Sequence, residues 1–129
     1  MNFQPINKES VPTMIEEWLH EQGELETPLT NEEAKEQIAK IKRLKGNWDG
    51  YYARKPVKES IAKAEAWVSH PPESGLFPSR ILASATGGVG LVFITKYTRY
   101  AVLEFCSNGI TILELKARNG DMQLYLVKE

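Results

Sequence analysis

The chain has 129 residues, of which 42% are hydrophobic and 26% charged, with a formal net charge of −1 and one cysteine. This composition excludes a chain that is disordered throughout, a disulfide scaffold and a uniformly basic nucleic-acid binder. No apolar run approaches the roughly 18 residues of a membrane span. The first residues lack a basic-then-apolar signal pattern. We therefore expect one domain, residues 1–129, in the cytoplasm.

The small net charge conceals an uneven distribution along the chain. Residues 1–36 hold nine glutamates and two lysines, a net of −7. Residues 37–65 hold eight basic and three acidic residues, a net of +5. An acidic segment is therefore followed directly by a basic one, and either could face a partner of opposite charge.

Helical patterns occupy residues 1–79. Thr13 and Glu16 have the spacing of a capping box, so we expect a first helix to begin at Thr13 and to end before Gly23. Thr30 and Glu33 repeat this signal for a second helix, which ends near Gly46. A third helix is expected after Pro56, and the prolines at 71–72 forbid its continuation.

Two-fold alternation replaces the helical pattern in residues 80–129. It predicts strands over 80–85, 89–95, 99–105, 110–116 and 122–127. The connections, two of them Asn-Gly pairs, are so short that they can join only antiparallel neighbours. The expected fold is α+β, with about three N-terminal helices packed on a five-stranded antiparallel β-meander whose last strand forms an apolar edge.

The middle strands carry apolar residues on both faces. In the third expected strand, for example, Leu103 and Phe105 alternate with Tyr100 and Val102. One face should pack on the helices. The apolar residues of the other are either scattered surface residues or an interface with a second subunit or partner. The sequence leaves these two readings open.

The segment 46–56, between the second and third helices, is rich in glycine and aromatic residues. Asn47 or Asp49 can accept a hydrogen bond from the backbone two residues on, and Gly50 permits a left-handed conformation. Trp48 can fill the junction of helices and sheet while its N–H reaches a carbonyl. A structured turn is the favoured interpretation, and a binding pocket is the alternative.

This segment resembles one found in small uncharacterised bacterial and phage proteins, whose pattern runs Asn-Trp-Asp-Gly-x-Gly-Ala-x-x-Pro before a helix, a proline-rich loop and a β-meander. The matching residues are Asn47, Trp48, Asp49, Gly50, Ala53 and Pro56. Tyr52 departs from the pattern, because it stands where the family has glycine. If that position requires a positive φ, Tyr52 is strained. The resemblance implies a small accessory protein of mobile elements and no particular activity.

Few residues of the chain suit catalysis or metal binding. His20 and His70 lie at expected helix ends, where they complement the helix dipole, and Cys106 precedes a hairpin as a small apolar group. The chain lacks the spaced His and Cys motifs of metal sites and the ending of a phosphate-binding loop. We expect no enzyme and no cofactor, with a small hydrolase that uses Asp49 as an alternative.

Nucleic-acid binding is another alternative, because basic residues surround the aromatic segment. The candidate contacts are Lys42, Arg43, Lys45, Arg54 and Lys55. The competing interpretation is that these are solvated helix faces paired with Glu36, Glu59 and Glu65, or neutralised by the acidic segment.

A protein-binding module is the favoured hypothesis. It would be an accessory or inhibitor protein, antitoxin-like or anti-defence-like, that masks a basic, nucleic-acid-handling partner with acidic helices, a sheet face or both. A homodimer is a further expectation. The candidate partner-binding residues are Glu16, Glu17, Glu21, Glu24, Glu32, Glu33, Trp48, Asp49, Tyr51 and Tyr52.

Overall fold

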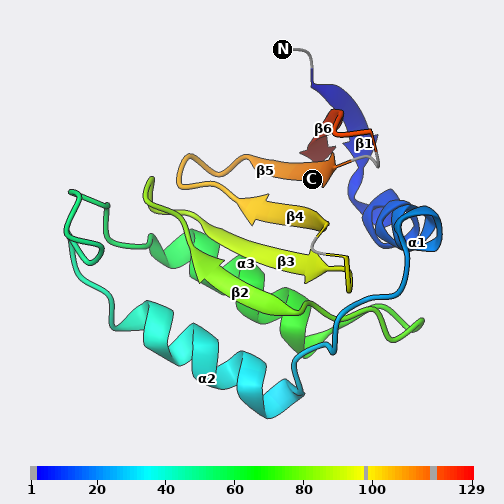
Figure 1. Cartoon of the computed structure of the whole chain (residues 1–129). Coiled ribbons are helices and arrows are strands. Elements are labelled where there is room, and N and C mark those ends of the chain that lie inside the picture. The colour runs from blue at the N-terminus through cyan, green and yellow to red at the C-terminus, as the bar shows by residue number, and fades with distance from the viewer. Residues whose placement is uncertain (1–2, 98, 117–118) are drawn as a thin grey trace.

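A computed structural model describes residues 3–97, 99–116 and 119–129, and it has an α+β architecture (Figure 1). A short 3₁₀ helix, η1 (Lys8–Ser10), leads into helix α1 (Val11–Gln22). Helices α2 (Asn31–Lys42) and α3 (Lys58–Ser69) follow. Three helices were expected, and three α-helices are present in this part of the chain.

In the part of the chain that the structure describes, the sheet has six strands rather than the five expected. They are β1 (Gln4–Asn7), β2 (Arg80–Ala83), β3 (Val89–Ile94), β4 (Tyr100–Phe105), β5 (Thr111–Lys116) and β6 (Met122–Lys128), in the order β1-β6-β5-β4-β3-β2. Strands β2 to β6 form the expected antiparallel meander. The sheet is nevertheless mixed, because β1 runs parallel to β6.

Strand β1 corrects the expectation that the last strand forms an edge of the sheet. Residues 4–7 pair with residues 125–128, so β6 has a neighbour on both sides (Figure 1). The new edge is only four residues long and contains Pro5, which has no N–H to offer a further strand. Short edge strands with proline resist edge-to-edge aggregation.

All three helices pack on one face of the sheet. Ile15 and Trp18 of α1, Ile38 of α2 and Ala64 of α3 join a single buried cluster with alternate residues of the strands. The strand members of this cluster are Ile81, Val89, Leu91, Phe93, Ala101, Leu103, Phe105, Leu113, Leu115 and Val127. Helical and sheet segments therefore share one hydrophobic core, with α2 against β2, α3 against β3 and β4, and α1 against β5.

The helix starts confirm one expected capping box and contradict the other. Thr30 accepts a hydrogen bond from the backbone of Glu33, whose side chain bonds back to Thr30. The Thr13 capping box is wrong, since α1 begins at Val11 after Ser10. Pro12 stands in the first turn of α1, where its missing N–H costs no intrahelical hydrogen bond.

No helix among the described residues is long and apolar enough to span a membrane.

Candidate functional site

The face of the sheet away from the helices carries apolar side chains on five adjacent strands. They are half-buried or exposed, whereas their neighbours along β4 and β5 are buried in the core or half-buried. Val92 of β3 lies on the same face and is buried, and in β6 the neighbours Gln123 and Tyr125 are exposed and half-buried. We call this set the open face: Leu82, Ile94, Tyr100, Val102, Ile112, Met122, Leu124 and Leu126. The sequence left open whether a second apolar face exists as a surface or as scattered residues, and the structure places these residues side by side.

Strand register brings the open-face residues together. Ile112 lies between Glu104 of β4 and Leu126 of β6, and one row along, Glu114 lies between Val102 and Leu124. Residues directly opposite on neighbouring strands have Cβ atoms about 5 Å apart. The open face is therefore a mainly apolar surface that also carries the carboxylates of Glu104 and Glu114. Lys116 lies on the same face opposite Met122, with its Nζ 5.6 Å from the centre of the Tyr100 ring.

The carboxylate of Glu114 lies in an environment that opposes its charge. Burial raises the pKa of Glu114, and the neighbouring charge of Glu104 raises it further. Cys106 adds a thiol to this group, since its Sγ lies 3.6 Å from Oε2 of Glu104. Burial, followed by the charge of Glu104, raises the pKa of that thiol to about 11. A cation placed between the carboxylates would relieve this repulsion.

The loop between α2 and α3 is a tightly bonded turn, as the sequence predicted. Oδ1 of Asp49 accepts hydrogen bonds from the backbone N–H groups of Tyr51 at 2.8 Å and Ala53 at 3.1 Å. Oδ1 of Asn47 accepts from the N–H of Tyr52 at 2.7 Å. The indole N–H of Trp48 donates to the carbonyl of Arg54 at 3.0 Å, which matches its expected role. Asp49 therefore shapes this turn through its carboxylate.

Tyr52 adopts the strained conformation that its sequence position suggested. Its φ is +66°, in the left-handed region that bulky residues rarely adopt, and Asn47 and Gly50 also have positive φ. The ring of Tyr52 is 90% exposed and that of Tyr51 is 86% exposed, so neither contributes to the core. Strain held without a packing benefit is a known mark of functional loops.

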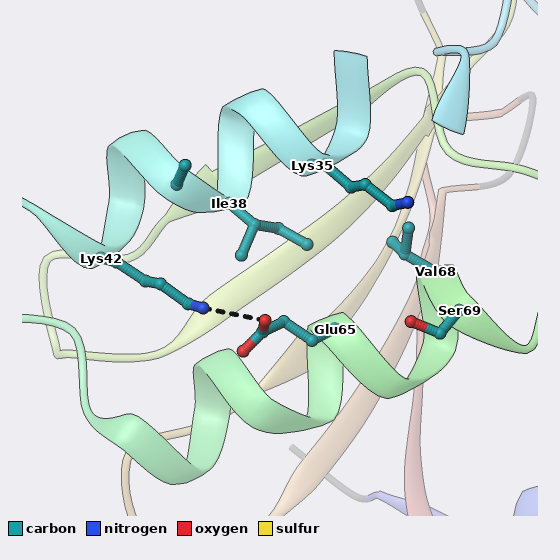
Figure 2. A pocket seen from close by; sticks show the side chains of 7 residues that line it. Lys35, Ile38, Lys42, Glu65, Val68 and Ser69 are labelled. Carbon is teal, nitrogen blue, oxygen red and sulfur yellow. Dashed lines mark hydrogen bonds and ion pairs between the residues drawn. The ribbon is translucent and has the colours of Figure 1, made fainter. Parts of the chain in front are cut away.

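The basic residues of the predicted nucleic-acid site divide into two groups. Lys42 forms an ion pair with Glu65 of α3 at 2.9 Å, across a cleft of about 280 Å³ between the two helices (Figure 2). Lys35, Ile38, Val68 and Ser69 also line this cleft. The other four are exposed, and no ion pair involves them among the described residues; they are Arg43, Lys45, Arg54 and Lys55.

The predicted acidic residues lie on two separate parts of the molecule. Glu16, Glu17 and Glu21 belong to α1, which packs against β5, and Glu24 follows α1. Glu32 and Glu33 belong to α2, which packs against β2, three strands away (Figure 1).

Several of these acidic side chains already have partners within the chain. Glu24 pairs with Lys96 at 2.8 Å, an interaction that lowers the pKa of Glu24. Glu16 accepts a hydrogen bond from Ser74, and Glu33 caps its own helix. None of these ion pairs or hydrogen bonds joins the acidic segment to residues 37–65 in the described part of the chain, so that segment does not neutralise the basic loop by direct pairing.

A further hollow of about 380 Å³ lies on the helical side, between α1 and α3. Leu103, Phe105 and Val127 contribute apolar lining, while His70 and Glu129 supply polar groups. Glu129 already forms hydrogen bonds with Lys63 and Thr111, and the hydrogen bond from Lys63 lowers the pKa of Glu129.

Within residues 3–97, 99–116 and 119–129, no group of three or more His, Cys, Asp or Glu side chains could hold a metal ion.

Sequence reasoning missed Glu104 and Glu114 as candidate functional residues. Each is the one acidic residue of a mainly apolar strand, YAVLEF or TILELK, and that interruption was the available signal. Their diagonal proximity follows from the register of β4 and β5.

Comparisons with known proteins give this chain no relative. No family model, curated protein or solved structure matches it. The two surfaces of this chain that are candidates for a function are the open face and the loop between α2 and α3.

Proposed function

We propose that this chain is a non-enzymatic protein-binding module whose open face docks a partner with an apolar surface and a basic side chain. The observation that carries the proposal is the uncovered, mainly apolar sheet face that also carries Glu104 and Glu114. Masking of the partner by this face would make the chain an accessory or inhibitor protein.

The size of the open face supports an interface. Five strands about 4.8 Å apart, with two or three side chains on each about 6.8 Å apart, cover roughly 300–400 Å² when the charged side chains of this face are included. A standard interface buries about 800 Å² on each partner, with an apolar centre and a polar rim. The open face therefore has the dimensions of an interface centre.

The carboxylates support a basic group on the partner. Glu104 and Glu114 already repel each other in a half-buried setting, and a partner that covered them with apolar atoms alone would bury two unpaired charges. An arginine or lysine between them would satisfy both and would discriminate against partners without such a residue.

The proposal is tested by photo-crosslinking within cells of the source organism. A photoreactive amino acid replaces Ile112 or Leu124 on the open face, and Lys35, which is exposed at the cleft between α2 and α3 on the helical side, serves as the control position. We expect one discrete adduct from the first two positions and none from Lys35. The partner in that adduct should also bind the purified chain, and Glu114→Gln should weaken that binding.

Two other outcomes would change the assignment. Adducts that contain only a second copy of this chain would make the open face a homodimer interface. The absence of a discrete adduct at both open-face positions would contradict the proposal.

A further inference from the structure

The loop between α2 and α3 presents two tyrosines to solvent on a rigid support. The hydrogen bond from the N–H of Asn47 to the carbonyl of Ala53, at 2.7 Å, closes the loop at its base. Two further backbone bonds anchor it to the β2–β3 turn, from Arg54 to Ala85 and from Val57 to Gly87. The rings of Tyr51 and Tyr52 project from a fixed backbone, so little further ordering is needed when a ligand binds.

The backbone at Tyr52 argues that its side chain has a role outside the fold. A glycine would adopt its φ of +66° without steric cost, whereas tyrosine does so with strain. The ring gains nothing from packing, because it is 90% exposed. The sequence therefore holds an aromatic ring at a position where the fold alone would be better served by glycine.

Unpaired cations flank the two rings. Arg43 and Lys45 precede the closed loop and Arg54 and Lys55 follow it, so the Asn47–Ala53 bond brings both pairs to its base. All four are exposed, and no ion pair involves any of them in the part of the chain that the structure describes. Asp49, the acidic residue within the loop, is bonded to backbone N–H groups.

We propose that this loop binds single-stranded nucleic acid. Tyr51 and Tyr52 stack on unpaired bases, while Arg43, Lys45, Arg54 and Lys55 contact the phosphates. A single strand is favoured over a duplex because adjacent exposed rings need bases whose faces are free. An acidic peptide would satisfy the four cations but would leave the rings without a stacking partner. This site is separate from the open face.

The test is a titration of fluorescein-labelled 15-mers of oligo(dT) and oligo(U), followed by fluorescence anisotropy at several salt concentrations. Four phosphate contacts predict a slope of about −3 for the logarithm of the association constant against that of salt. Each of Tyr51→Ala and Tyr52→Ala should weaken binding roughly 5- to 100-fold. The double variant Arg54→Glu, Lys55→Glu should both weaken binding and flatten the salt slope.

Matched controls separate this site from general effects. Tyr97 is exposed at the other end of β3, and Lys35 is exposed on α2, so Tyr97→Ala and Lys35→Glu should leave affinity unchanged. Ile112→Lys on the open face should also leave it unchanged, which keeps this proposal independent of the proposed protein interface. Tyr52→Gly removes the ring and relieves the strain, so it should lower affinity while the protein melts at a higher temperature.

Three results would overturn the proposal. The first is no change in anisotropy at 100 μM protein and low salt. The second is equal affinity for a 15-base-pair duplex or a decaglutamate peptide, which would remove the role of stacking. The third is an equal loss of affinity in Tyr97→Ala and in the two loop tyrosine variants.

Discussion

The two faces of the same sheet are built from the same kinds of residue but have different surroundings. On the covered face, Leu91 and Leu113 are fully buried beneath the helices. One residue before Leu113 in β5, Ile112 on the open face remains half-buried without any helix above it. Both faces are rich in valine, leucine and isoleucine, but the charged side chains of Glu104, Glu114 and Lys116 lie on the open face.

The difference between the covered and open faces indicates which apolar residues stabilise the fold and which are available for binding. The helices cover one face only, so apolar residues there are explained by the core. Those of the open face have no helix packed on them, and burial beside them raises the pKa of Glu114. A surface that the fold does not require is the best place to look for binding.

The largest expected effect is a contrast between Leu113 and Ile112, which are adjacent in β5 and point to opposite faces. Leu113→Ala should lower the free energy of unfolding by about 2–5 kcal/mol, because it opens a cavity in the core. Ile112→Ala should lower it by less than about 1 kcal/mol. Urea denaturation measures both. Equal losses would show that the open face is packed like the core.

The second contrast compares Tyr52 with Tyr51 in the loop. Tyr52→Gly should raise the free energy of unfolding by ~0.5–1 kcal/mol, because relief of the left-handed strain exceeds the added entropy of the unfolded chain. Tyr51→Gly is the matched control, since Tyr51 does not have a positive φ, and it should be mildly destabilising. Urea denaturation measures the free energy of unfolding of both variants. A loss of stability in both would argue against strain at Tyr52.

The third contrast concerns the pH dependence of stability at the open face. The raised pKa of Glu114 means that the folded chain holds a proton more tightly than the unfolded chain does. Stability from this group is therefore present at low pH and is lost as pH rises through that pKa. Glu114→Gln should raise the melting temperature at pH 7 by about 2 °C and have less effect at pH 4.

The matched control for Glu114 is Glu73→Gln, because Glu73 is exposed in the loop after α3, away from the open face. It should leave the melting temperature unchanged at both values of pH. A drop in melting temperature for Glu114→Gln at pH 7 would show that its carboxylate stabilises the fold.

The smallest expected effect is on reactivity and leaves stability unchanged. With a pKa of about 11, the thiol of Cys106 is almost wholly protonated at pH 8. Alkylation by iodoacetamide should be roughly 100-fold slower in the folded protein than in urea. Glu104→Gln should speed it up, because the charge of Glu104 contributes to the raised pKa. Mass spectrometry follows the reaction, and equal rates in the two states would contradict the half-buried environment.

Much of the fold could be predicted because its signals are local. The capping box at Thr30, the proline stop after α3 and the alternation of five strands each occupy only a few consecutive residues. Strand β1 could not be predicted in this way, since four residues with a proline show no pattern. Its partner lies about 120 residues along the chain, and only the assembled sheet brings the two together.

The residues of the candidate site also differ in whether local sequence could predict their roles. The turn-forming roles of Asn47, Trp48 and Asp49 follow from local chemistry, and the structure has those bonds. The sequence could not say that both tyrosines would be exposed, because aromatic residues pack as often as they project. Nor could it place Glu104 beside Glu114, because that requires the register between β4 and β5.

The parallel pairing of β1 with β6 also sets an order of assembly. Strand β1 is made at the beginning of this chain and its partner at the end, so during synthesis β1 has no neighbour while the helices and the meander emerge. Contacts between such distant segments close large loops and slow folding. We expect the antiparallel strands and their helices to fold first, with the segment of β1 closing onto β6 as the final step.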